Sequence, residues 1–213
     1  MKGRRSAGFT VLELLVLIGT LMVVVTLAMP QLSQGCKARA SRISCTSNLK
    51  QIGLAYRTWA NEHEERFPME LTVAEDGTKE LALTGLPFSS FTIISNELNN
   101  PKPLHCPDDK KRDRATTFPQ LTVKNISYFL GLDVTQLNPA TILSGDRNLC
   151  FNGKPTYRLL QTTNWPAITW GANIHEHQGD LGLADGSAHQ VTDVMLQRAL
   201  QASRIATNRF AIP

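Results

Sequence analysis

Apolar residues are concentrated in one run near the start of the chain. Residues 9–29 are apolar almost throughout, and Glu13 is the only charged residue among them. As a helix that rises about 1.5 Å per residue, this run is about 30 Å long, which is the thickness of the hydrocarbon core of a bilayer. The pattern predicts a membrane-spanning helix over residues 9–29, and Pro30 predicts a kink directly after it.

A second apolar pattern follows with the period of an amphipathic helix. Spacings of 4, 3, 4 and 3 place one stripe on a single helix face, formed by Cys45, Leu49, Ile52, Tyr56 and Trp59. We expect the N-terminal helix to continue to residue 61 and to pack this stripe on a globular head.

Residues 62–213 show shorter patterns, bounded by Gly, Asn and Pro. Residues 90–98 predict a short helix, and the stretches KNISYFLGL and TILSGDR predict strands. Asp185 and Gly186 lie between DLGLA and SAHQV, which predicts a hairpin with a tight two-residue turn. Residues 192–206 predict a closing helix, and residues 107–117 predict a charged surface loop, so the head is expected to be α+β.

Charge and composition exclude several functions. The net charge is +4, and three of the positive charges, Lys2, Arg4 and Arg5, lie in the first eight residues, so the rest of the chain carries only +1. This distribution gives no basic surface for nucleic acid. The chain offers no nucleophile with a base and an orienting group, and no phosphate-binding loop. We therefore expect neither an enzyme nor a cofactor.

The start of the apolar run carries a specific motif. The stretch GFTVLELL (8–15), preceded by a basic leader, resembles the cleavage and methylation site of type IV prepilins and type II secretion pseudopilins. The resemblance implies that prepilin peptidase cuts after Gly8 and that the new N-terminal residue, Phe9, is methylated. It also implies an assembly role for Glu13 and places Pro30 where that family has a proline in the membrane part of its helix.

A second resemblance covers the rest of the chain. Four stretches occur in the order seen in a group of bacterial prepilin-like proteins that ends in His, nine residues and Asp-Gly; here these are His175 and Asp185-Gly186. The stretches are CTSNLKQIGLAYRTWANEHEERFP, LHCPDDK, ISYFLGL and ILSGDRN. The resemblance implies a type IV pilin-like α+β fold, in which a long N-terminal helix packs on a small antiparallel sheet. It assigns no chemistry to the motif.

The two resemblances divide the chain into four parts. Residues 1–8 form a cleaved leader, and residues 9–29 form the transmembrane and assembly half of the helix. Residues 30–61 form its amphipathic half, and residues 62–213 form the head with its C-terminal hairpin and helix.

The single acid of the apolar run needs a partner, because an unpaired carboxylate in hydrocarbon is costly. Cleavage after Gly8 would create an ammonium group at Phe9, one helical turn from Glu13. Between packed helices, Glu13 of one subunit could meet the ammonium group of its neighbour. This hypothesis gives Glu13 a role in the axial register of a filament.

His175 and Asp185 admit two interpretations. The first is a metal or catalytic pair, with His177, Asp180 and His189 as further candidates. The second, which we favour, is a polar clamp that holds the loop before the last hairpin, because the histidine spacings match no strong metal signature. Asp180 and Asp185 are weak calcium candidates, since two carboxylates are few for a cage of about 6–8 oxygens.

Four cysteines, Cys36, Cys45, Cys106 and Cys150, would lie outside the cytoplasm after insertion, where disulfides form. Cys36 and Cys45 lie on opposite sides of one helix and cannot be joined within it. We favour a Cys45–Cys106 disulfide, with Cys150 as the competing partner. Metal binding by the cysteines is less favoured because no CxxC pair is present.

The resemblances imply a structural subunit of a type IV pilus (a fimbrium) or a type II secretion pseudopilus. Such a subunit crosses the bacterial inner membrane once, with its N-terminus in the cytoplasm and its head in the periplasm or outside the cell. Its partners are other pilin or pseudopilin subunits, prepilin peptidase, the inner-membrane assembly platform and membrane lipid. The alternative is a membrane-tethered binding module, resembling a minor pilin, whose head contacts a ligand or a secreted substrate.

Overall fold

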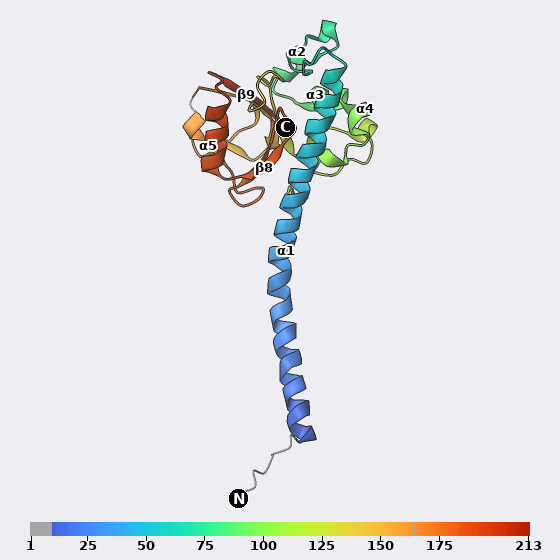
Figure 1. Ribbon diagram of the computed structural model, residues 1–213, viewed down its shortest axis with the longest axis vertical. Helices are drawn as coiled ribbons and strands as arrows, with labels where there is room; N and C mark the ends of the chain where they lie inside the picture. The colour runs from blue at the N-terminus through green and yellow to red at the C-terminus, as the bar shows by residue number, and fades with distance from the viewer. Residues whose placement is uncertain (1–9, 164) are drawn as a thin grey trace, which may run out of the picture. The chain divides into compact units, whose positions relative to one another are not determined.

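The computed structural model describes residues 10–163 and 165–213, without the side chains of residues 27–36 and 165. Figure 1 shows the course of the chain. The chain divides into two compact units, of which the first ends at Ala40 and the second comprises Ser41–Pro213. The second unit is the head.

The first long element is the helix α1, Val11–Asn61, of 51 residues. Its start is capped by Thr10, because Glu13 accepts hydrogen bonds of 3.0 Å from the backbone nitrogen and from the hydroxyl group of Thr10, and the Glu13 nitrogen donates back to that hydroxyl at 3.3 Å. The helix continues past Pro30, so this proline does not end it.

The expected single-pass placement in the inner membrane is corrected by the structure. Over the part of the chain that is described, no helix is both long enough and apolar enough to cross a membrane. The side chains of residues 11–26 are exposed.

The expected fold class is also wrong. The head is mixed α+β, and its main sheet has six strands, with a second sheet of three. Only the last part of α1, from Ser41, belongs to the head, and the remaining helices of the head are short. The arrangement is therefore not one long N-terminal helix packed on a small sheet.

The six-stranded sheet is antiparallel throughout, in the order β5-β9-β1-β2-β7-β8. Its strands are β1 (Tyr128–Gly131), β2 (Ile142–Asp146), β5 (Arg158–Thr162), β7 (Gly179–Leu183), β8 (Ala188–Val191) and β9 (Asn208–Ile212). The second sheet has the order β4-β3-β6, with β3 (Leu149–Phe151), β4 (Lys154–Pro155) and β6 (Ile168–Trp170). The two expected strands are confirmed as β1 and β2.

The helices of the head are short. They are α2 (Lys79–Ala82), α3 (Phe88–Ile93), α4 (Ser95–Leu98) and α5 (Asp193–Ala202), with 3-10 turns at Val73–Glu75, Lys102–Leu104, Phe118–Gln120, Val123–Asn125 and Trp165–Ala167. The helix expected over residues 90–98 is divided between α3 and α4. The closing helix ends at Ala202, and the chain then forms β9, which the sequence did not predict.

The expected hairpin is present between β7 and β8, but its loop has three residues rather than two. Leu183 and Ser187 pair across it, and the Gly186 nitrogen donates to the Leu183 oxygen at 3.0 Å. Gly186 has φ +84°, while Asp185 is not in the left-handed region. A single left-handed glycine after a turn gives the three-residue loop with a bulge, whereas the two-residue type I′ turn expected for Asp-Gly needs positive φ at both positions.

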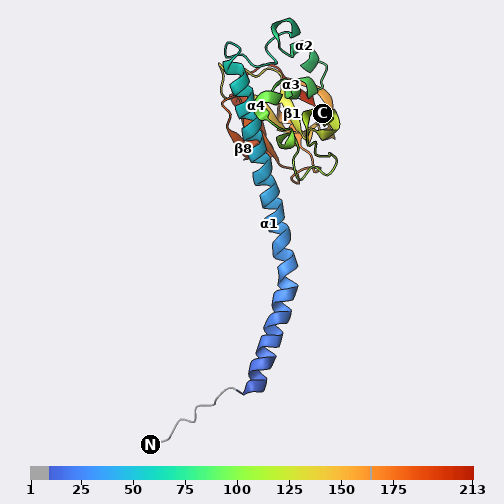
Figure 2. The ribbon, with the colours of Figure 1, turned by 90° about the vertical axis from the view of Figure 1, so that its right-hand side faces the viewer.

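Both faces of the sheet are covered. On β1, Tyr128 and Leu130 belong to the core that contains the α1 stripe, while Phe129 between them belongs to the core under α5. Figures 1 and 2 show the head part of α1 beside β8, and Figure 1 shows α5 across the sheet from it. Burial on both faces explains why β1 is apolar without alternation. All five residues of the predicted stripe on α1 are buried.

A disulfide joins Cys45 of α1 to Cys106 of the loop after Lys102–Leu104. This is the pairing favoured from the sequence. Cys150 is a buried free thiol, and the side chain of Cys36 lies outside the described residues. The bond attaches α1 to the head across 61 residues of sequence.

Loss of this bond should destabilise the head. A chain with both Cys45→Ser and Cys106→Ser should lose about 4 kcal/mol of unfolding free energy, because the unfolded chain is no longer closed into a loop of 61 residues. Guanidinium unfolding followed by tryptophan fluorescence measures this. The control is Cys150→Ser, which removes a buried thiol without opening a loop, and an equal loss in that variant would contradict the prediction.

Candidate functional site

Helix α1 lies along β7, the strand that leads from His175 to Asp185-Gly186. The Thr46 hydroxyl donates to Asp180 at 3.0 Å. One turn later on α1, the Leu49 side chain lies 3.7 Å from where a Cβ atom on Gly182 would be. After a further turn, Gly53 lies against the backbone of Gly186. The segment with the His-nine residues-Asp-Gly motif is therefore the part of the sheet on which α1 docks.

His175 occupies the first end of this segment, in the loop between β6 and β7. Its side chain is fully buried. Nδ1 lies 2.8 Å from an oxygen of Asp108, and Nε2 lies 3.4 Å from Sγ of Cys106 and 3.6 Å from an oxygen of Asp146. Burial lowers the pKa of His175, against the opposing effect of Asp108. The ring is therefore expected to be mainly neutral at pH 7 and to sit directly against the disulfide.

Two buried carboxylates lie beside the histidine. Asp146 ends β2 and accepts a hydrogen bond of 2.7 Å from the Asp180 nitrogen. Burial raises the pKa of Asp146 well above its usual range, and the negative charge of Asp180 raises it further. Burial also raises the pKa of Asp180 to about 6, although Thr46 and Arg42 oppose the shift. The pair therefore holds protons at a pH where ordinary aspartates are ionised.

Arg42 and Thr46 of α1 hold the polar side of this contact. Arg42 lies 4.0 Å from Asp180 and donates to the side chain of Gln178. Arg42 precedes the apolar stripe and Thr46 lies next to its first residue, Cys45. Neither residue was assigned a role from the sequence. Arg42 lies three residues before Cys45, and Thr46 lies three residues before Leu49. This spacing is the only sequence signal that places the two residues at the edge of the docking face.

The second end of the segment is the β7–β8 turn. Arg57 of α1 donates to the backbone oxygen of Asp185. A Cβ atom on Gly53 would lie 3.2 Å from the Gly186 Cα, so the helix and the turn touch through their backbones. Gly186 also has the left-handed φ that disfavours a side chain. The Asp-Gly pair thus positions the turn against α1.

The motif residues are not brought together as one chemical centre. His175 contacts the cysteine loop, whereas Asp185 lies beyond the far end of β7. Asp180 lies in β7 and Asp185 in the turn that follows it. The calcium site considered from the sequence stays a prediction. Among the described residues, His177 and His189 contact neither His175 nor these carboxylates.

No family model, curated protein or solved structure matches this chain.

A buried ion pair was missed in the segment expected to be a charged surface loop. Asp109 is almost fully buried, and its two oxygens accept from Nε of Arg147 at 2.6 Å and from Nη2 at 2.7 Å. A bidentate pair of this kind satisfies both charges in the interior. It holds the Cys106 loop on the connection between β2 and β3. Nothing in the local sequence distinguishes Asp109 from its exposed neighbours.

The structure describes only some of the residues expected to act in processing and assembly. Gly8 and Phe9 lie outside the described residues. Pro30 lies within α1, but its side chain is not described. Glu13 is exposed and caps the helix through Thr10. The pattern Thr-x-x-Glu is a capping box, a signal that was present in the sequence and was not used.

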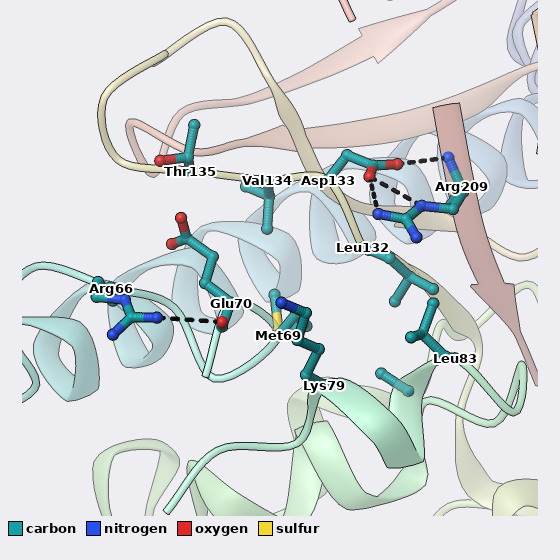
Figure 3. Close-up of a pocket in the computed structure, with 11 residues that line it drawn as sticks. Arg66, Met69, Glu70, Lys79, Leu83, Leu132, Asp133, Val134, Thr135 and Arg209 are labelled. Carbon is teal, nitrogen blue, oxygen red and sulfur yellow. Dashed lines mark hydrogen bonds and ion pairs between the residues drawn. The ribbon is translucent and has the colours of Figure 1, made fainter. Parts of the chain in front are cut away.

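The head also has an open pocket of about 360 Å³, which lies away from the motif (Figure 3). Its charged lining consists of Arg66, Glu70, Lys79, Asp133 and Arg209. Arg209 binds Asp133 through Nε at 2.9 Å, and Arg66 donates to the backbone oxygen of Glu70 at 3.3 Å. Among the lining residues that the structure describes there is no histidine or cysteine. The pocket therefore has a lining of mixed charge.

The carboxylate pair predicts a pH-dependent difference between variants. Because the pKa of Asp180 is raised in the folded chain, its ionisation destabilises the fold as the pH rises from about 4 through 6. Asp180→Asn removes that ionisation and can still accept from Thr46. Its unfolding free energy should rise relative to wild type between pH 4 and 7, by up to about 3 kcal/mol.

Denaturant unfolding of both chains at several pH values measures this difference, and the contribution of His175 cancels because both chains carry it. Asp76→Asn, at an exposed position, is the matched control and should show no trend. A difference between Asp180→Asn and wild type that stays constant from pH 4 to 7 would contradict the prediction.

Proposed function

We propose that this chain is a filament subunit of the type IV pilin and pseudopilin class, assembled through the first part of α1. The observation that carries the proposal is the exposed apolar surface of residues 11–26. The large hydrophobic side chains described there are 43–77% exposed. They are Val11, Leu12, Leu14, Leu15, Val16, Leu17, Ile18, Leu21, Met22, Val23, Val24 and Val25.

A helix that is apolar on all sides needs partners on all sides. Exposed patches of this extent mark interaction surfaces. In a filament, the same helices from neighbouring subunits surround one another, which satisfies this requirement with copies of one surface. The GFTVLELL motif, which resembles the processing site of prepilins, supports the same conclusion and adds prepilin peptidase and an assembly platform as partners.

Glu13 gives the assembly its register in this proposal. It is the only charged residue of the exposed apolar segment. An ammonium group at a processed Phe9 would be its natural partner on a neighbouring subunit, and such a pair is much stronger among apolar helices than in water. In the single chain, Glu13 instead bonds to Thr10. Assembly would therefore exchange a local cap for a contact between subunits.

A second candidate function rests on the pocket in Figure 3. Its volume of about 360 Å³ lies in the range of small-ligand sites. Its paired charges suit a ligand with both acidic and basic groups. In this alternative the head is a binding module that contacts a ligand or secreted substrate, and filament formation is not required.

Substitutions at Glu13 separate the two candidates. Glu13→Ala and Glu13→Gln should leave the head folded, because Glu13 lies outside the head unit. Both should reduce the fraction of chains recovered as cross-linked multimers or in sheared filaments, since neither side chain can neutralise an ammonium group. The binding-module function predicts equal fractions for wild type and both variants.

Thr10→Ala is the matched control for capping. It removes the side-chain part of the cap but keeps the carboxylate. If Glu13 acts between subunits, Thr10→Ala should assemble nearly as well as wild type. Equal defects in Thr10→Ala and Glu13→Ala would assign Glu13 to capping alone and count against its role in assembly. Glu62→Gln, an exposed acid at the end of α1, controls for loss of charge.

Processing gives an independent prediction. In cells that contain a prepilin peptidase, the mature chain should begin at Phe9 and carry a methyl group on its amino nitrogen. Intact-mass measurement of the purified chain determines both. A chain that retains residues 1–8 in the presence of active peptidase would contradict the proposal. Gly8→Val, which changes the residue before the cut, should remain unprocessed.

A further inference from the structure

Four groups that bind metals converge around the disulfide. Cys45 comes from α1, Cys106 from the following loop region, Asp146 from the end of β2, and His175 from the loop after β6. One ligand atom from each lies within 4.8 Å of the others, and all four residues are buried. They are separated by up to 130 residues in sequence, which is why no spacing motif revealed them.

The spacing of the atoms is close to that of a tetrahedral zinc site. With the usual bond lengths, ligand atoms on zinc lie about 3.6 Å apart for sulfur and nitrogen and about 3.4 Å apart for nitrogen and oxygen. Here Sγ of Cys106 lies 3.4 Å from Nε2 of His175, and Nε2 lies 3.6 Å from an oxygen of Asp146. The two sulfur atoms would have to separate to about 3.8 Å, and the remaining ligand atoms already lie within 4.8 Å of one another.

The histidine is oriented as a metal ligand. Its Nδ1 lies 2.8 Å from a carboxylate oxygen of Asp108. This contact is an ion-pair distance, and Nδ1 has no hydrogen-bond partner of good geometry among the described residues. A small turn of either side chain would place the carboxylate on Nδ1, which is the arrangement usual for zinc-bound histidine. Asp108 therefore serves as the outer support of the cluster, and it is itself partly exposed.

Asp146 supplies an independent indication. It is fully buried, and its Oδ1 has no hydrogen-bond partner among the described residues, whereas Oδ2 accepts from the Asp180 nitrogen. A buried carboxylate oxygen without a partner is costly. Oδ2 is the oxygen that lies 3.6 Å from Nε2 of His175, and a cation bound by this carboxylate would offset the cost of burying Oδ1 as well.

We propose that this cluster is an exchangeable site, which holds the Cys45–Cys106 disulfide when oxidised and one zinc ion when reduced. A dithiol supplies the two electrons and two protons that convert the disulfide into two thiols, and the dithiol becomes a disulfide. Zinc then displaces the two thiol protons and the proton that Asp146 holds, which pass to solvent, and it binds both thiolates, Nε2 of His175 and the Asp146 carboxylate. The site is closed, because all four ligands come from the protein.

The two forms would hold the same elements together. The disulfide connects α1 to the Cys106 loop, and zinc would connect these two and also β2 and the His175 loop. Reduction in the presence of zinc would therefore keep α1 docked on the head. The proposal goes beyond the filament function and does not depend on it.

The test uses the full chain in a mild detergent, with zinc alone as the ligand. A phosphine reduces the disulfide to two thiols and takes up oxygen from water, so that no free thiol competes for the metal. The reduced chain should bind about one zinc ion, measured by competition with a chromophoric chelator, with release of protons from the thiols. The oxidised chain should bind none at this site. Cobalt in place of zinc should give the visible bands of tetrahedral thiolate coordination.

Variants test the ligand set. His175→Gln and Asp146→Asn should each weaken zinc binding by more than Asp108→Asn, for which about 10–100-fold is expected of an outer support. Cys150→Ser and His177→Gln, which lie outside the cluster, should bind like wild type. Circular dichroism of each reduced variant shows whether the head is folded. If Asp146→Asn does not fold, His175→Gln and the cobalt spectrum decide the ligand set.

Three outcomes would overturn the proposal. They are equal zinc binding by the oxidised and reduced chains, a folded reduced wild type that binds no zinc, and unchanged affinity in folded His175→Gln. Glu13→Ala and Glu13→Gln, which the proposed function expects to assemble poorly, should still bind zinc like wild type once reduced, because Glu13 lies outside the head unit.

Discussion

The structure of the head depends on how the last part of α1 is attached to it. An apolar stripe, from Cys45 to Trp59, fills the core on one side of the sheet. The disulfide from Cys45 to Cys106 fixes this helix covalently where the stripe begins. Within the stripe, Gly53 of α1 lets the helix backbone come close to Gly186 of the β7–β8 turn. Without the helix, the face of the sheet that bears Tyr128 and Leu130 would be exposed to water.

This attachment also explains why charge is buried beside the disulfide. Asp146 and Asp180 lie where α1 crosses the ends of β2 and β7, and a polar side of the helix, with Arg42 and Thr46, faces Asp180. Water is excluded there by the same packing that buries the stripe, so the pKa values of both carboxylates rise. The packing that buries the apolar stripe therefore also sets the protonation of these two carboxylates.

Periodicity predicted the parts of the fold that depend on neighbours in sequence. It identified the stripe on α1, the strands β1 and β2 and the β7–β8 hairpin, because each shows its period or turn residues locally. It failed for β9, where Asn208 and Arg209 give little sign of a strand, and for Asp109, whose burial depends on Arg147 on another element. The predicted membrane span was wrong, because no helix among the described residues has both the length and the apolar character needed to cross a membrane.

The position of β9 has a consequence for synthesis of the chain. This strand lies between β5 and β1 in the six-stranded sheet, although it is the last strand in sequence. Until residues 208–212 have left the ribosome, β5 has no neighbour in the sheet and one edge of β1 is open, and open edges invite pairing with other chains. The head can therefore close its sheet only after residues 208–212 have emerged, and until then the open edges of the nascent chain must be kept from pairing with other chains.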